Sequence, residues 1–292
     1  MTKILDGKKL SDLIKTELTS EVTSLKQKGT IPKLGVILVG EFPPSIVYVR
    51  NKEKACLKVG IETETIRLTK DTKIEAILAI IDKWNNDEKH HGILVQMPLP
   101  DHISQDEVLM RINPQKDVDG LTPINFGKLI TSEPFFYPCT PLGIIELLKA
   151  NEIKIQGKHA VIVGRGGLVG KPLANMLLQK NSDHGNATVT VCHTKTKDIG
   201  AMTRQADILV VAIGSPKFLK ADMVKQGVII IDAGINRVEV NGEQKLVGDV
   251  DFDEVKEVAS AITPVPGGVG PMTITMLMLN TLKAAKLAAG LT

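Results

Sequence analysis

The chain has 292 residues, of which 43% are hydrophobic and 3% aromatic, and its net charge of +3 balances 36 basic against 33 acidic side chains. This near-balance and the scarcity of aromatic rings argue against broad electrostatic or stacking surfaces for nucleic acid or a membrane. The apolar runs fall far below the ~20 residues that a membrane span needs. The N-terminal segment also lacks the apolar core of a secretory signal.

The cysteines argue against a disulfide framework and against a zinc site. Cys56, Cys139 and Cys192 are few and far apart, and no C-x-x-C pair occurs. This pattern indicates neither a disulfide framework nor a zinc site, so we expect no bound metal. A reducing, cytoplasmic compartment fits best.

Helical and strand-like segments alternate along the first half of the chain. Helical spacing covers 8–28, 45–59 and 74–85, and strand-like runs cover 34–39, 61–68 and 92–96. Such alternation is typical of βαβ units around a mostly parallel sheet.

An irregular, proline-rich stretch at 113–141 separates this half from a second α/β unit. The strands expected there are 159–163, 187–192, 208–212, 228–232 and 260–262, and a long helix follows over 272–289. The length is typical of about two domains. We therefore predict two α/β domains with an active-site cleft between them, the second domain being a Rossmann-like parallel sheet. The predicted boundaries are 1–140, with the helix at 272–292 packing back on it, and 141–271.

A glycine-rich turn follows the strand at 159–163. Its glycines include Gly164, Gly166 and Gly170, and a helical pattern begins directly after it. Strand, glycine turn and helix form the layout that holds a dinucleotide pyrophosphate. The spacing departs from G-x-G-x-x-G, and a simple tight turn between strand and helix is the alternative.

The end of the next strand favours NADP over NAD. An NAD site usually places an acidic residue there for the ribose 2′-hydroxyl. This chain has His193, Thr194 and Lys195 instead, with no acid before Asp198, and Arg165 lies in the glycine turn. Basic and hydroxyl groups suit a 2′-phosphate, although a solvated Lys195 is the simpler explanation for that residue alone.

Further turns are compatible with a ligand crevice. Small residues around Gly214, and the segment around Ile235, follow the third and fourth strands of the second half, where a cofactor can lie. The rigid loop with Pro266 and Gly267 precedes the last helix, and its glycines would allow close backbone approach to a ligand.

The first half carries the residues with acid–base chemistry. We expect Ser45 to cap a helix on which Tyr48 and Lys52 share one face. A partly desolvated lysine can act as acid or base, although an exposed lysine beside a packing tyrosine is the commoner case. Gln96 ends a strand where ligands bind in parallel sheets. Asp117 and Asp119 lie in a loop before Gly120, where turn chemistry is an alternative explanation for both.

Seven segments in the same order resemble the bifunctional methylenetetrahydrofolate dehydrogenase/methenyltetrahydrofolate cyclohydrolase family, often called FolD. They are S-x-x-Y-x-x-x-K at 45–52, V-Q-M-P-L-P at 95–100, K-D-V-D-G at 116–120, P-C-T-P at 138–141, V-G-R-G-G-L-V-G at 163–170, A-T-V-T-V-C-H at 187–193 and P-V-P-G-G-V-G-P-M-T at 264–273. The resemblance covers essentially the whole chain. One departure is Gly166, where the family usually has serine.

The resemblance implies a role for each matching residue. Lys52 would be the cyclohydrolase acid/base and Gln96 would orient it. Tyr48 would stack on the folate and Asp119 would bind its pterin. Arg165 would contact the NADP 2′-phosphate, with His193 and Thr194 nearby.

The implied function is NADP-dependent oxidation of 5,10-methylenetetrahydrofolate, then hydrolysis to 10-formyltetrahydrofolate, by a homodimer. This function would place the chain in one-carbon metabolism that feeds purine biosynthesis. Two alternatives remain at this point: a dehydrogenase of another small substrate such as a hydroxy or keto acid, without cyclohydrolase activity, and a non-catalytic NADP-binding regulator.

Overall fold

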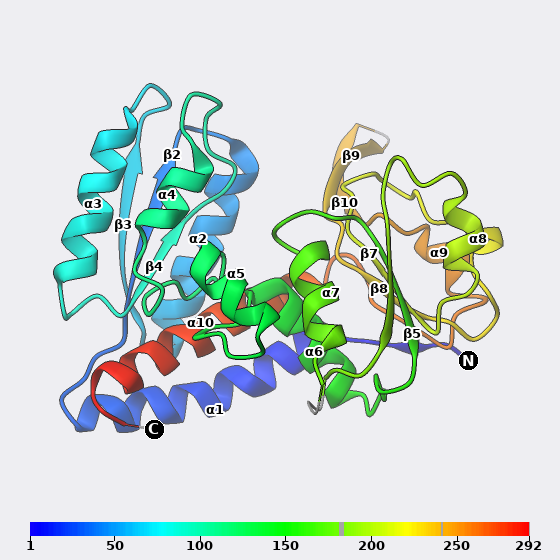
Figure 1. The fold of residues 1–292 in the computed structure, drawn as a ribbon, viewed down its shortest axis with the longest axis horizontal. Coiled ribbons are helices and arrows are strands. Elements are labelled where there is room, and N and C mark those ends of the chain that lie inside the picture. The colour runs from blue at the N-terminus through cyan, green and yellow to red at the C-terminus, as the bar shows by residue number, and fades with distance from the viewer. Residues whose placement is uncertain (181–183, 241, 292) are drawn as a thin grey trace. The chain divides into compact units, whose positions relative to one another are not determined.

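The structure is a computed structural model and describes residues 1–180, 184–240 and 242–291. The chain forms two compact units, each with its own parallel sheet (Figure 1). The six-stranded unit comprises Met1–Asp12 and Thr140–Thr273, and the three-stranded unit comprises Leu13–Cys139 and Ile274–Thr292. Neither unit is continuous in sequence.

The three-stranded unit has the strand order β3-β2-β4, with all pairings parallel. Its strands are β2 (Lys33–Val39), β3 (Glu62–Leu68) and β4 (Gly92–Val95), and its helices include α2 (Pro43–Val59), α3 (Ile74–Asn86), α4 (Gln105–Arg111) and α5 (Pro123–Ile130). The central strand β2 is buried after Lys33, as its continuous apolar sequence requires. A Cβ added at Gly35 would lie 2.6 Å from the Trp84 ring, so glycine lets α3 pack directly on β2.

Two long helices, α1 (Gly7–Gln27) and α10 (Val269–Ala288), each contribute residues to both units. Within the three-stranded unit they run side by side, blue and red in Figure 1, and an ion pair joins Lys286 to Glu21. No helix among the described residues is long and apolar enough to cross a membrane.

The six-stranded unit has the strand order β1-β11-β8-β7-β5-β6, with all pairings parallel. Its strands are β1 (Lys3–Ile4), β5 (His159–Val163), β6 (Thr188–Cys192), β7 (Ile208–Val211), β8 (Ile229–Asp232) and β11 (Ala261–Ile262). Its helices include α6 (Cys139–Ala150), α7 (Gly170–Leu178), α8 (Ile199–Thr203) and α9 (Phe252–Val255), with a 3-10 turn at Ala221–Met223. An antiparallel hairpin, β9 (Asn236–Val240) and β10 (Glu243–Val247), lies outside this sheet.

The α/β fold class and the Rossmann-like parallel sheet of the second half are confirmed. The N-terminus differs from the expectation for residues 1–140, because β1 pairs with β11 and brings Met1–Asp12 into the six-stranded unit. The prediction for Ser45 was wrong. Helix α2 begins at Pro43 after Phe42, because two prolines preset its first turn, and Ser45 is buried within the helix.

Candidate functional site

Two glycines shape the turn between β5 and α7. Gly164 has φ 123°, and a Cβ added there would lie 2.2 Å from the Ala212 carbonyl oxygen. A Cβ at Gly170 would lie 2.0 Å from the carbonyl oxygen of Gly164. Both positions therefore require glycine, whereas Gly166 and Gly167 face open space. The serine usual in the family would fit at Gly166, so this departure is not forced by packing.

Helix α7 begins after an exposed turn, although the Lys171 N–H of its first turn already donates to the Gly166 carbonyl at 3.1 Å and Pro172 has no N–H. Its N-cap residue, Val169, makes no side-chain capping bond, and the turn before it is exposed from Arg165 to Leu168. Backbone N–H groups at such a helix start favour a phosphate. The glycine cradle thus fits a dinucleotide pyrophosphate.

The predicted 2′-phosphate residues lie at the ends of neighbouring strands. Val163 of β5 pairs with Cys192 of β6, so Arg165 and the turn at 193–196 follow the same edge of the sheet. Within that turn the Lys195 N–H donates to Nδ1 of His193 at 3.1 Å, and the Thr194 and Lys195 side chains are exposed. Asp198 caps α8 by accepting from the Ala201 N–H at 2.8 Å. Asp198, the first acidic residue after β6, is therefore engaged in capping α8.

Two buried carboxylates that the sequence analysis did not single out lie beneath the next turns. Asp249 accepts from the N–H groups of Ile213 and Gly214 at 2.7 and 2.9 Å and from the Asn236 side chain at 2.8 Å. Asp232, at the end of β8, accepts from the N–H groups of Gly234, Asp249 and Val250 at 2.9–3.0 Å. Ile235 lies between residues held by these two carboxylates.

The Asp232 carboxyl makes folding stability depend on pH. Burial raises its pKa to about 6 from 3.8, the charge of Asp249 adds to this rise, and three backbone hydrogen bonds oppose it. A raised carboxyl pKa gives stability that is complete below the unfolded value and is lost as pH rises through the folded value. The difference corresponds to up to about 3 kcal/mol.

We expect wild-type protein without cofactor to lose stability relative to Asp232→Asn as pH rises from about 4 to 7, because the carboxyl pKa is about 6 in the folded protein and 3.8 ordinarily. Urea unfolding of both proteins across this range measures the effect, and the constant cost of the substitution cancels in the comparison. Parallel stability curves would rule out Asp232 as the titrating group.

The loop with Pro266 and Gly267 belongs to the six-stranded unit. Gly267 has φ 110°, and its carbonyl accepts from the Lys8 N–H at 2.8 Å. A Cβ at Gly7 would lie 1.9 Å from the Gly268 oxygen, so the start of α1 packs tightly on this loop. Pro266 remains exposed. Its predicted contact with substrate stays a prediction.

In the three-stranded unit, Lys52 and Gln96 meet directly. The Lys52 ammonium donates to Gln96 Oε1 at 3.0 Å, and Gln96 Nε2 donates to the Met97 carbonyl at 2.7 Å. Because a carbonyl can only accept, it fixes the amide with its oxygen toward Lys52. Gln96 follows the carboxyl end of β4 and is buried, whereas Lys52 on α2 is half-buried. The amide thereby gives the ammonium a fixed direction.

Tyr48 lies one turn before Lys52 on α2 and is half-buried. Ser45 lies about one helical turn before Tyr48 on the same helix. Its side chain is buried and donates to the Met97 carbonyl at 3.4 Å. That contact joins α2 to the residues after β4. Ser45 therefore supports the carbonyl that orients Gln96.

The two acids of the 116–120 loop have different environments. Asp117 is buried and accepts from the N–H groups of Leu121 and Thr122 and from the Asn125 side chain. Burial raises the pKa of Asp117, and these hydrogen bonds oppose the rise. Asp119 is half-buried. The turn explanation therefore applies to Asp117, which leaves Asp119 as the candidate for ligand binding.

Cys139 shows that Asp119 and Lys52 share one neighbourhood. Burial raises the pKa of its thiol well above the ordinary value, the charge and hydrogen bonding of Asp119 raise it further, and Lys52 opposes the shift. Asn280 of α10 donates to the carbonyl of Val118, next to Asp119, at 2.8 Å and to the carbonyl of Tyr137, close to Cys139 in the sequence, at 3.1 Å. Lys52 and Gln96 are thus in direct contact, Asp119 and Lys52 both influence the Cys139 thiol, and Asn280, which has no signal in the sequence, supports the loop that carries Asp119.

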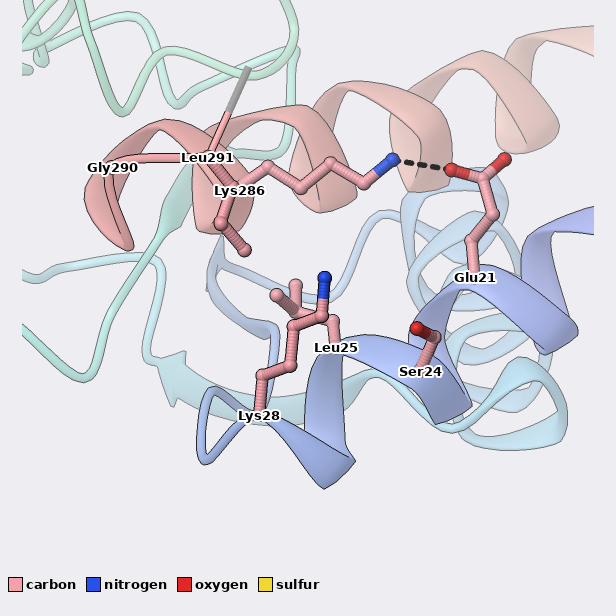
Figure 2. Close-up of a pocket in the computed structure, with 7 residues that line it drawn as sticks. All are labelled: Glu21, Ser24, Leu25, Lys28, Lys286, Gly290 and Leu291. Carbon is pink, nitrogen blue, oxygen red and sulfur yellow. Dashed lines mark hydrogen bonds and ion pairs between the residues drawn. The ribbon is translucent and has the colours of Figure 1, made fainter.

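A separate pocket of about 360 Å³ lies between α1 and the end of α10. Glu21 and Lys286, which line it, form the ion pair drawn in Figure 2, and Lys28 also lines it. None of the predicted site residues lines this pocket. Among residues 1–180, 184–240 and 242–291, no group of three or more His, Cys, Asp or Glu side chains is arranged to hold a metal ion.

The parallel sheet, the glycine turn and the Lys52–Gln96 pair define a dinucleotide-dependent enzyme with a separate acid–base centre. Family models agree in detail: "Tetrahydrofolate dehydrogenase/cyclohydrolase, catalytic domain" matches residues 5–119, and the NAD(P)-binding domain of the same family matches 138–289. The chain belongs to the tetrahydrofolate dehydrogenase/cyclohydrolase family.

Relatives match over nearly their whole length. The bifunctional protein FolD of Exiguobacterium sibiricum is 52% identical over 98% of this chain and 100% of its own. That of Dehalococcoides mccartyi is 55% identical over 99% and 98%.

Solved structures agree with these relatives. The crystal structure of the bifunctional enzyme FolD from Campylobacter jejuni has a TM-score of 0.93 at 52% identity, covering 98% of this chain and 99% of that one. The Trypanosoma brucei enzyme, complexed with NADP cofactor and inhibitor, has a TM-score of 0.92 at 38% identity, covering 99% and 98%.

Proposed function

We propose that this chain oxidises 5,10-methylenetetrahydrofolate to 5,10-methenyltetrahydrofolate with NADP and then hydrolyses the product to 10-formyltetrahydrofolate. Family membership supports both activities. The observation that carries the residue assignment is the Lys52–Gln96 hydrogen bond, with the amide fixed by the Met97 carbonyl. A dehydrogenase of another small substrate has no observation in its favour.

The oxidation needs positioning more than acid–base help. When bound, NADP accepts a hydride from the bridging carbon of the substrate, and the lone pairs of the two flanking nitrogens stabilise the cation that remains. Gly164 and Gly170 would hold the pyrophosphate, and Arg165, His193 and Thr194 would surround the 2′-phosphate. Asp119 would hold the pterin, and Tyr48 would pack on the folate.

The hydrolysis moves protons, and Lys52 is well placed to move them. Water attacks the methenyl carbon, and the new C–O bond forms as the water loses a proton. The hydroxyl group then loses its proton and becomes the formyl C=O, while the bond from this carbon to N5 breaks and N5 takes a proton, which leaves the formyl group on N10. Lys52 Nζ would carry protons between these positions, with Gln96 holding it in line.

A coupled assay tests the whole proposal. It follows NADPH and methenyl absorbance after addition of 5,10-methylenetetrahydrofolate, and we expect the methenyl signal to rise and then decay. NADPH formation without that decay would leave only the dehydrogenase. Reduction of NADP with a hydroxy acid and not with the folate would favour the other substrate class.

Arg165→Ala is expected to raise the KM for NADP about 10- to 100-fold, because a charge-assisted contact with the 2′-phosphate is lost. The KM for NAD, which lacks this phosphate, should change far less. Steady-state kinetics with both cofactors measures the difference. An equal rise for both would contradict the 2′-phosphate contact.

We also infer that the protein acts as a cytoplasmic homodimer. The support is the family resemblance and, for the compartment, the three free and buried cysteines. Light scattering during size exclusion tests the dimer, and a monomer at micromolar concentration would contradict it.

A further inference from the structure

The two buried carboxylates of the six-stranded unit have space made for them by glycines. A Cβ at Gly234 would lie 2.2 Å from Cγ of Asp249, and a Cβ at Gly248 would lie 1.8 Å from Oδ2 of Asp232. Asp249 is 0% exposed and Asp232 is 3% exposed. Removing a charge from water is costly unless hydrogen bonds compensate it, and each carboxylate here accepts three.

The donors come from the turns that carry two predicted cofactor residues. Asp249 holds the N–H of Gly214, which has φ 67°, after β7. After β8, Asp232 accepts from the Gly234 N–H and Asp249 accepts from the Asn236 side chain. Gly234 and Asn236 are the residues on either side of Ile235. Ile235 itself is 41% exposed. The carboxylates therefore fix the backbone while leaving this side chain accessible.

The strand order says which half of the cofactor these turns face. Strand β6 lies on one side of β5, and β7 and β8 lie on the other. In a dinucleotide fold the pyrophosphate lies at the first glycine turn and the adenosine ribose at the end of the next strand, here β6. The nicotinamide half must then extend over β7 and β8.

We propose that Asp249, supported by Asp232, is a positioning residue that holds the Gly214 and Ile235 turns in the shape that receives the nicotinamide half of NADP. This inference rests on the proposed cofactor. The carboxylate acts through backbone N–H groups and touches no reacting atom. Its loss should weaken binding of the whole dinucleotide and spare its adenosine end.

The test is Asp249→Ala, with Asp249→Asn as the conservative variant. Alanine leaves two backbone N–H groups and Asn236 without their acceptor. Asparagine can keep one oxygen toward the two N–H groups, and the Asn236 amide can rotate to accept from its new NH₂ group. We expect the KM and Kd for NADP to rise about 10- to 100-fold in the alanine variant and clearly less in the asparagine variant.

Two readouts separate positioning from loss of fold. Binding of adenosine 2′,5′-bisphosphate, which lacks the nicotinamide half, should stay within about twofold of wild type. Cyclohydrolase activity on methenyltetrahydrofolate, measured without cofactor, should also be unchanged. Asp207→Ala is the matched control: Asp207 accepts from the His159 N–H at 2.9 Å at the opposite end of the same sheet, and NADP affinity should not change.

The outcomes are distinguishable. The positioning role is overturned if folded Asp249→Ala binds NADP as tightly as wild type does. It is also overturned if the affinity for adenosine 2′,5′-bisphosphate falls as much as the affinity for NADP. If the alanine variant does not fold, the asparagine variant decides in the same way. Failure of wild-type protein to reduce NADP would overturn the proposed function instead.

Discussion

Lys52→Met is expected to abolish the cyclohydrolase, with a loss of about 10²- to 10⁴-fold, the usual contribution of a positioned acid–base group. Methionine keeps the length and apolar stem of the lysine but cannot carry a proton. Gln96 Oε1 would lose the hydrogen bond that it accepts from the Lys52 ammonium at 3.0 Å. The dehydrogenase step needs no proton transfer, so its kcat should fall far less.

Decay of methenyltetrahydrofolate absorbance without cofactor measures the first effect, and NADPH formation measures the second. Lys54→Met is the control, because Lys54 is an exposed lysine on the same helix. Undiminished hydrolysis in Lys52→Met would remove Lys52 from the mechanism. A parallel collapse of both activities would point to damaged folate binding.

Asp119→Ala is expected to raise the KM for the folate about 10- to 100-fold in both reactions, because one carboxylate would hold the pterin in each. The KM for NADP should be unaffected. Steady-state kinetics of the two reactions on the same preparation measures this pattern.

Asp101→Ala, which removes an exposed carboxylate from the same unit, is the control. If only one of the two reactions suffers in Asp119→Ala, the pterin role is wrong. Asp117 is unsuitable for the comparison, because it accepts from Leu121, Thr122 and Asn125 and so holds the loop itself.

The long periodic segments were predictable from sequence because their signal is local. Helix α3 and the buried strand β2 lie where the apolar spacing placed them. The hairpin β9–β10 was missed although an Asn-Gly pair at 241–242 is a strong hairpin signal. Helix α5 was missed although Thr122 and Pro123 form a good helix start.

Long-range partners could not be predicted in this way. Strand β1 has two residues, and its partner β11 lies near the other end of the chain. The Lys52–Gln96 contact joins residues 44 apart, and only the family resemblance indicated it. Asp249 has no local pattern, since its role depends on turns that approach it in the fold. Such residues become visible when their hydrogen bonds are known.

The discontinuous units have a consequence for biosynthesis. The ribosome makes the chain from the N-terminus, so the residues of the Lys52 centre exist long before Asn280, whose amide holds the Val118 carbonyl beside Asp119. The N-terminal strand β1 likewise waits for β11, more than 250 residues later. A chain cut just before residue 274 would contain every predicted site residue and still leave the Asp119 loop without its last support. Nascent chains of this protein must therefore remain incompletely packed until the final helix is released.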